Sequence, residues 1–155
     1  MNISTTLIGL FFLLIFLCPI IYVLVKEKKE RKLISKRIDD ICSQHALQKT
    51  KPEIIGKTVF MIDHAQNSII EFNKGKNDDY HLFRFKNLEH CTVEKTTMNN
   101  ESNVISIASI TILFITKEKT KTVITVFDDD YPNSLESEAI LYQSHQLVNA
   151  INKRL

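Results

Sequence analysis

Glycine is scarce in this sequence, with only three among 155 residues. So few glycines leave no glycine-rich loop whose backbone could cradle a phosphate, which argues against an enzyme acting on mononucleotides. The H-E-x-x-H zinc motif and the D-x-D-x-D-G calcium loop are absent as well. The common sequence signatures of phosphate and metal chemistry are therefore missing.

Cysteine is present, but in a pattern that carries no cross-link. Cys18, Cys42 and Cys91 are far apart and odd in number, unlike a disulfide framework or a zinc site. Free thiols are typical of a reducing compartment. We expect each cysteine to be a small buried or semi-buried residue.

Charge is distributed unevenly along the chain. Residues Met1–Val25 contain no charged side chain, Lys26–Pro52 carry nine Lys or Arg against four Asp or Glu, and Glu53–Leu155 carry eleven against fourteen. The net charges of the last two segments are therefore +5 and −3. Because the positive excess lies outside the C-terminal part, and that part has no aromatic and basic platform, the sequence predicts no nucleic-acid partner.

The uncharged segment predicts a membrane anchor. Leu7–Val25, "LIGLFFLLIFLCPIIYVLV", is nineteen residues long and as a helix would rise about 28 Å, close to the thickness of the bilayer core. A cleaved signal peptide would need basic residues before the apolar run, and a lipoprotein signal would need a small residue before its cysteine, where Leu17 stands. The sequence favours a retained anchor, with cleaved and lipidated forms as the alternatives.

The basic residues after the anchor predict its orientation. Seven of the twelve residues from Lys26 to Arg37 are Lys or Arg. The predicted location is the cell membrane (the inner or cytoplasmic membrane), and the positive-inside rule places the C-terminal domain in the cytoplasm and the N-terminus on the outer side. The same side chains are predicted to contact anionic lipid headgroups. They are Lys26, Lys28, Lys29, Arg31, Lys32, Lys36 and Arg37.

A helical stripe continues beyond the basic residues. Ile34, Ile38 and Ile41 follow the i, i+4, i+7 spacing of one helix face. This face could lie on the membrane, pack on the domain or pair with another copy of the chain, and the spacing favours a stalk helix continuous with the anchor.

Pro52 and Gly56 in "KTKPEIIG" predict the boundary between the stalk and the domain. We thus expect an anchor at residues 1–25, a stalk and linker at 26–52, and a domain at 53–155.

From Lys57 onward the apolar residues recur with a period of two, which predicts strands. Expected strands cover residues 57–63 and 68–72, joined by the turn "DHAQN", then 80–86 and 91–98. Residues 104–127, "VISIASITILFITKEKTKTVITVF", predict a hairpin with its turn at "KEKT". Ile105 and Ile107 alternate out of phase with Ile110 and Ile112, so a bulge or break is expected near Ala108–Ser109.

The last predicted element is an amphipathic helix at 134–154. Asn133 and Glu136 have the spacing of a capping box. The face expected to be apolar consists of Ile140, Leu141, Ser144, Leu147, Val148, Ile151 and Leu155. The fold class is therefore α+β: an N-terminal transmembrane and stalk helix, then six or seven antiparallel strands in a curved sheet or open barrel, capped by the C-terminal helix.

Consecutive hairpins followed by one helix resemble the pleckstrin-homology-like (PH-like) fold. More locally, "FMIDHAQNSIIEF" followed by "HLFRFKNLEHCTVEK" resembles a bacterial PH-like pattern over most of residues 56–155. The matching residues are Phe60, Ile62, Asp63, Phe85, Asn87, Leu88, Val93 and Glu94. Asn87 stands where the pattern more often has Asp. The resemblance implies a binding or scaffolding module without a catalytic residue, and it places Asp63–His64 at a hairpin tip.

Two groups of residues deserve a chemical interpretation. Asp63 and His64 are adjacent, so on a strand they point to opposite faces and make a poor catalytic pair. Asp128, Asp129 and Asp130 form a carboxylate cluster that could hold Mg²⁺ or Ca²⁺, yet acidic residues before a helix also complement its dipole. The sequence therefore predicts no catalytic, metal-binding or cofactor-binding residue, with the three aspartates as weak metal candidates.

These patterns favour a membrane-tethered cytoplasmic module that binds an unknown protein partner or assembles with itself. Its lipid contact is the anchor helix, and no specific headgroup is expected because the "DHAQNS" loop has no Lys or Arg. One alternative is a small membrane-bound, metal-assisted hydrolase that combines Asp128–Asp130 with a histidine such as His81 or His90. Another is an immunity or accessory subunit of an envelope complex.

Overall fold

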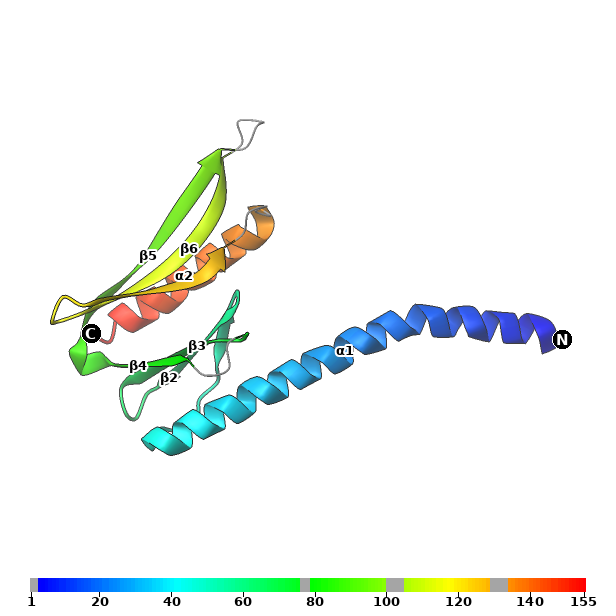
Figure 1. The fold of residues 1–155 in the computed structure, drawn as a ribbon, viewed down its shortest axis with the longest axis horizontal. Coiled ribbons are helices and arrows are strands. Elements are labelled where there is room, and N and C mark those ends of the chain that lie inside the picture. Colours follow the sequence, from blue (N-terminus) through cyan, green and yellow to red (C-terminus); the bar gives the residue numbers. More distant parts are fainter. Residues whose placement is uncertain (1–2, 76–78, 100–104, 129–133) are drawn as a thin grey trace. The chain divides into compact units, whose positions relative to one another are not determined.

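The computed structural model describes the backbone of residues 3–75, 79–99, 105–128 and 134–155, and the side chains of these residues except 3–12, 99, 105 and 134. The chain divides into two compact units, Met1–Ala46 and Leu47–Leu155. The first is helical, and the second contains all the strands and the C-terminal helix (Figure 1).

The first unit is a single helix, α1 (Ile3–His45), which contains Pro19. The predicted continuity between the apolar segment and the basic stalk is thereby confirmed. Ala46 has a positive φ of 55°, the left-handed conformation in which helices commonly end. Cys18 is exposed on this helix, so the expectation that it would be buried is wrong: apolar neighbours at positions 13–17 and 20–25 are exposed there too.

Where side chains are described, no helix has a stretch long and apolar enough to cross a membrane. The predicted span of residues 7–25 begins with Leu7 to Phe12, whose side chains lie outside that description.

In its described residues, the second unit contains seven antiparallel strands and one α-helix. The first sheet, in the order β1-β2-β3-β4, contains β1 (Glu53–Ile55), β2 (Thr58–Asp63), β3 (Ser68–Asn73) and β4 (Tyr80–Arg84). The second, in the order β5-β6-β7, contains β5 (Leu88–Asn99), β6 (Ile105–Thr116) and β7 (Lys121–Asp128). The α+β class and the strand count are confirmed, although the strands form two open sheets where one curved sheet or barrel was expected.

Two local features depart from the sequence expectations. β1 was missed, because three residues after Pro52 are too short to show a period. The predicted strand at 80–86 ends at Arg84, since Phe85–Asn87 form a 3-10 turn, η1. There the Phe85 N–H donates to the Asn67 carbonyl over 2.9 Å and the Phe85 side chain is buried, so the chain turns from the first sheet into the second.

The predicted bulge in β6 is confirmed. Thr96 pairs with Ser109 and Thr97 with Ile107, which leaves Ala108 as the extra residue. The inserted residue lets side chains of both phases point inward, and Ile107 and Ile110 are both buried.

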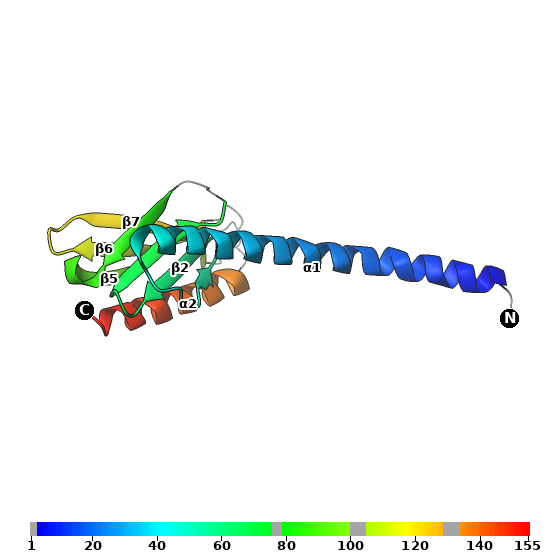
Figure 2. The same cartoon turned by 90° about the horizontal axis from the view of Figure 1, so that it is seen from below.

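The C-terminal helix α2 (Ser134–Asn152) covers the core between the sheets and contacts β1, β5, β6 and β7 (Figures 1 and 2). The predicted face is buried at Ile140, Ser144, Leu147, Val148 and Ile151. Leu155 was wrongly included: it lies beyond the helix and is 44% exposed. The predicted cap, Asn133, is outside the described residues.

Asn152 fastens the end of α2 to the second sheet. Its side-chain amide donates to the Cys91 carbonyl at 2.8 Å, and its amide oxygen accepts from the Cys91 N–H at 2.9 Å. One side chain thereby takes the place of a neighbouring strand at this point of β5, the edge strand of its sheet. A helix end and a sheet edge satisfy their polar groups together.

A corner joins the two sheets at Gly56. The Lys57 N–H donates to the Val126 carbonyl at 3.4 Å, and the Thr58 hydroxyl donates to the Thr125 carbonyl at 3.4 Å. Val126 is the extra residue of a bulge in β7, because Ile110 pairs with Phe127 while Thr111 pairs with Thr125. Gly56 has a positive φ of 56°, and a Cβ there would overlap the Val126 carbonyl oxygen.

Gly56→Ala is expected to destabilise the domain by about 2–4 kcal/mol, since it adds a left-handed backbone penalty to a clash with backbone. Urea unfolding of the full chain, followed by near-UV circular dichroism, measures the loss. The matched control is Gly75→Ala, whose added Cβ comes no closer than 3.6 Å to the Asn73 side chain. Equal stability of the two variants would contradict the importance of this corner.

Candidate functional site

Asp63 is a structural turn residue. It is 1% exposed at the end of β2, and its carboxylate accepts hydrogen bonds from the backbone N–H groups of Ala65 and Gln48 at 2.8 Å and of Gln66 at 3.2 Å. Burial acts to raise the pKa of this carboxyl, but the three backbone donors and nearby His64 together bring it below its usual value. The carboxylate therefore binds the hairpin tip and the incoming linker together.

Asp63→Asn is expected to destabilise the domain by about 1.5–3 kcal/mol at pH 7, because the amide NH₂ replaces one of the accepting oxygens. A depressed folded pKa means that the stabilisation is complete above the unfolded pKa of about 3.9 and is lost as the pH falls through the folded pKa. The difference between wild type and variant should therefore shrink in acid. The measurement is urea unfolding from pH 7 to pH 3.

The control for this series is Asp128→Asn, which changes an exposed aspartate at the end of β7. It should track the wild type across the pH range. A constant difference between wild type and Asp63→Asn down to pH 3 would show that the Asp63 charge is not the stabilising element.

The histidines named in the hydrolase alternative lie on different sheets. His81 on β4 is hydrogen-bonded through Nδ1 to Oε2 of the buried Glu71 at 2.8 Å and stacks on Phe83 with ring centroids 5.9 Å apart. His90 is an exposed residue of β5. Among the described residues, Asp128 forms no hydrogen bond or ion pair with either histidine.

The weak metal candidates are only partly described. Asp128 ends β7, while Asp129 and Asp130 fall outside the described residues. Within the portion of the chain that is described, no group of three or more His, Cys, Asp or Glu side chains is arranged to hold a metal ion.

Two of the three thiols are buried, as expected. Cys42 and Cys91 are buried and form no disulfide with a described residue, and burial raises the pKa of the Cys91 thiol to about 12. Cys91 packs in the core between the sheets. A thiol in this environment is inert, because the thiolate is the reactive form.

Alkylation by iodoacetamide at pH 8 should reach Cys91 at least about 10³-fold more slowly in the native chain than in urea, since unfolding returns its pKa to about 8.5. Peptide mass spectrometry of the labelled chain follows Cys91 separately from the other two thiols. Comparable rates in the two states would contradict a closed core around β5.

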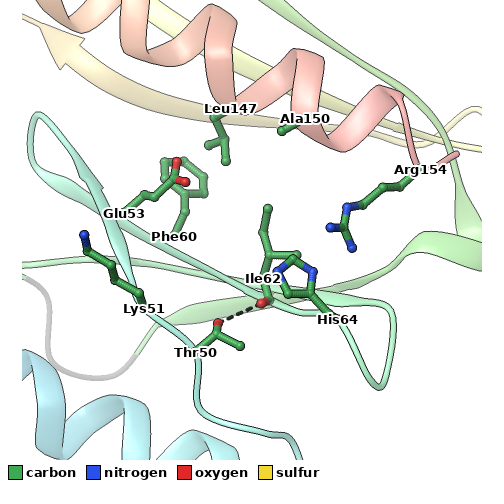
Figure 3. Close-up of a pocket in the computed structure, with 9 residues that line it drawn as sticks. All are labelled: Thr50, Lys51, Glu53, Phe60, Ile62, His64, Leu147, Ala150 and Arg154. Atoms are coloured by element: carbon green, nitrogen blue, oxygen red, sulfur yellow. Dashed lines mark hydrogen bonds between the residues drawn. The ribbon is translucent and has the colours of Figure 1, made fainter.

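A hollow of about 350 Å³ lies between the start of the domain and the end of α2 (Figure 3). Its apolar lining consists of Phe60 and Ile62 from β2 with Leu147 and Ala150 from α2. Thr50 closes one side and donates its hydroxyl to the Ile62 carbonyl at 2.7 Å. The hollow thus has an apolar floor between a strand and a helix.

Charged side chains stand around this floor. Arg154 and His64 point toward each other at one end, from the end of α2 and the β2–β3 turn, while Lys51 and Glu53 stand at the other (Figure 3). The Arg154 guanidinium forms no hydrogen bond or ion pair with any described residue. An unpaired cation beside an apolar surface is suited to an anionic ligand that also has an apolar part.

A second hollow, also about 350 Å³, adjoins the first and shares Lys51 and Glu53 with it. It runs along β1, including Ile54 and Ile55, to Gln143 and Gln146 on α2. Together we call the two hollows the β1–α2 groove. Sequence reasoning missed this groove, because its strand was not predicted and its residues lie almost a hundred positions apart.

A separate hollow of about 300 Å³ lies beside the Asp63 turn and is lined by Gln66, Asn67, Arg84 and Lys86. The turn itself has no Lys or Arg, but the fold brings two cations to it, Arg84 from the end of β4 and Lys86 from η1. Only strand pairing could have revealed this, since Ser68 pairs with Arg84.

The seven basic residues predicted to contact lipid all lie on α1. Six of them are exposed, and Arg31 lies 3.9 Å from Glu27 one helical turn away. Their contact with a membrane surface stays a prediction.

No protein-family model, curated protein or solved structure matches this chain.

Proposed function

We propose that this protein is a single-pass membrane protein whose C-terminal domain, PH-like in fold, acts in the cytoplasm as a non-catalytic binding or scaffolding module. The observation that carries the proposal is one uninterrupted helix, α1, along which an apolar segment is followed directly by a basic one. Its partner is a protein or a second copy of the chain.

The exposed surface of α1 supports the tether. Large apolar side chains at positions 13–17 and 20–25 are 39–76% exposed, and because these positions are nearly consecutive they cover every side of the helix. A helix that is apolar all round needs an apolar environment. The basic residues that follow suit the cytoplasmic headgroup region, where each contributes about 1 kcal/mol.

The architecture of the second unit supports the module. The order of its elements agrees with the PH-like resemblance of the sequence: a four-stranded sheet is followed by a three-stranded sheet and one helix. The domain presents a groove with an unpaired arginine beside a sheet edge, which is the kind of surface that recognises a peptide.

Arginine at the centre of the span should release the chain from membranes. Phe16→Arg together with Leu17→Arg adds about 2.5–3.5 kcal/mol per residue to the cost of insertion. The double variant is expected in the carbonate-soluble fraction, and the wild type in the pellet. Leu135→Arg, at an 83% exposed position of α2, is the control and should stay in the pellet. A wild type that carbonate extracts would overturn the tether.

Proximity labelling from a tag fused after Leu155 tests the orientation and the partner together. The expected result is a reproducible set of cytoplasmic or membrane proteins, reduced when the seven basic residues from Lys26 to Arg37 are changed to Gln. The matched control changes Lys117, Lys119 and Lys121, which lie in and beside the β6–β7 turn. Labelling confined to the opposite side of the membrane would contradict the orientation.

A further inference from the structure

We propose that the β1–α2 groove binds an extended peptide segment of the partner protein, which adds as a strand to β1 and carries a bulky apolar residue near an acidic one. This inference rests on the proposed function and assigns its binding surface. Four observations support it: the free edge of β1, the facing side of α2, the apolar floor and the charge at one end.

Among the described residues, no strand pairs with the outer edge of β1. β1 is the first strand of its sheet and pairs only with β2, through Glu53–Phe60, Ile54–Val59 and Ile55–Thr58. Beyond these pairs, residues 53–55 form no backbone hydrogen bond with any described residue. Unpaired N–H and C=O groups on an edge strand are a template for another strand.

The rest of the β2 edge is already occupied, which limits where a strand can add. Thr50 bonds to the Ile62 carbonyl, and the Gln48 N–H bonds to the Asp63 carboxylate. The incoming linker therefore covers β2 beyond β1. An added strand must lie against β1 itself, beside α2.

α2 provides the second wall of the groove. Gln143, Gln146, Leu147 and Ala150 line it, and their spacing of three, four and seven residues places them on one helix face. This face rises about 10 Å from Gln143 to Ala150, and Arg154 follows just beyond the end of the helix at Asn152. The length suits four or five residues of extended chain at about 3.3 Å each.

The floor and the charges select the composition of the peptide. The accessible part of the floor consists of the half-buried Ile62 and the exposed Ala150, while Phe60 and Leu147 are 1% and 2% exposed. The Arg154 guanidinium, unpaired among the described residues, stands at the end of that surface with His64 (Figure 3). Since residues 53–155 carry a net charge of −3, this cationic end is a local exception that attracts a carboxylate.

The test selects ligands from a phage-displayed library of random octapeptides on the full-length chain in detergent micelles. Enriched peptides are expected to combine a bulky apolar residue with an acidic residue a few positions away. Synthetic fluorescent versions are then titrated by anisotropy against the wild type and four variants of exposed positions.

Two variants change the groove, and each has a neighbour that does not line it. Ala150→Trp fills the apolar part and is expected to weaken binding at least tenfold, whereas Asn149→Trp should leave it unchanged. Arg154→Gln removes the cation and is expected to weaken binding roughly tenfold to a hundredfold, whereas Lys153→Gln should have no effect. Far-UV circular dichroism confirms that all four fold.

Each of the following results would overturn the proposal: no enrichment over an empty-micelle selection, enriched peptides that bind Ala150→Trp as tightly as wild type, or displacement of no peptide but saturable binding of dodecanoate, titrated as a probe for a free acyl chain. Loss of self-association in Ala150→Trp without peptide binding would assign the groove to a second copy and also overturn it. The tether is judged separately: a membrane-bound chain whose labelled partners are unchanged in Ala150→Trp keeps the proposed function and loses only this surface.

Discussion

The domain depends on a backbone contact between its two sheets, where the Lys57 N–H meets the Val126 carbonyl. The bulge in β7 makes this contact possible, because an extra residue in one strand turns a carbonyl away from the ladder. Gly56 makes it close enough, since no side chain fits there and its left-handed φ turns the chain from β1 into β2. Packing follows from this corner: Phe83 of the first sheet stacks on Phe114 of the second, with ring centroids 4.3 Å apart and planes 5° from parallel.

The corner between the sheets also determines where α2 packs and why the β1–α2 groove stays unfilled. With the sheets joined at Gly56, the core stays open along one side, and α2 covers it with Ile140, Leu147 and Ile151. Asn152 fixes the helix end to β5 through Cys91. No comparable hydrogen bond joins α2 to β1 among the described residues. The groove is therefore the part of the boundary between helix and sheets that the fold leaves unfilled.

Much of this fold was predictable because its signals are local. Alternation predicted β2, β3, β6 and β7, and the change of phase between Ile107 and Ile110 predicted the bulge at Ala108. β1 was not predictable, since three residues show no period and their partner strand gives them their structure. The 3-10 turn at Phe85 depends on a hydrogen bond to Asn67, eighteen residues earlier. Asp63 was correctly assigned to a turn, but the donor from Gln48 that explains its burial comes from the linker. The groove was beyond sequence reasoning because it joins residue 54 to residue 150.

A tethered domain does not need a tight groove to act. On the proposal made above, four or five added residues would bury one apolar side chain and form one ion pair, and such contacts alone give weak affinity, since association itself carries a large entropic cost. Confinement to a membrane changes this balance, because two proteins held in one bilayer meet at a raised effective concentration without any new contact. A weak groove then responds to whether its partner is in the same membrane. On this proposal the apolar segment of α1 raises the effective concentration of the partner, and the β1–α2 groove determines which partner binds. Binding therefore needs both parts of the chain.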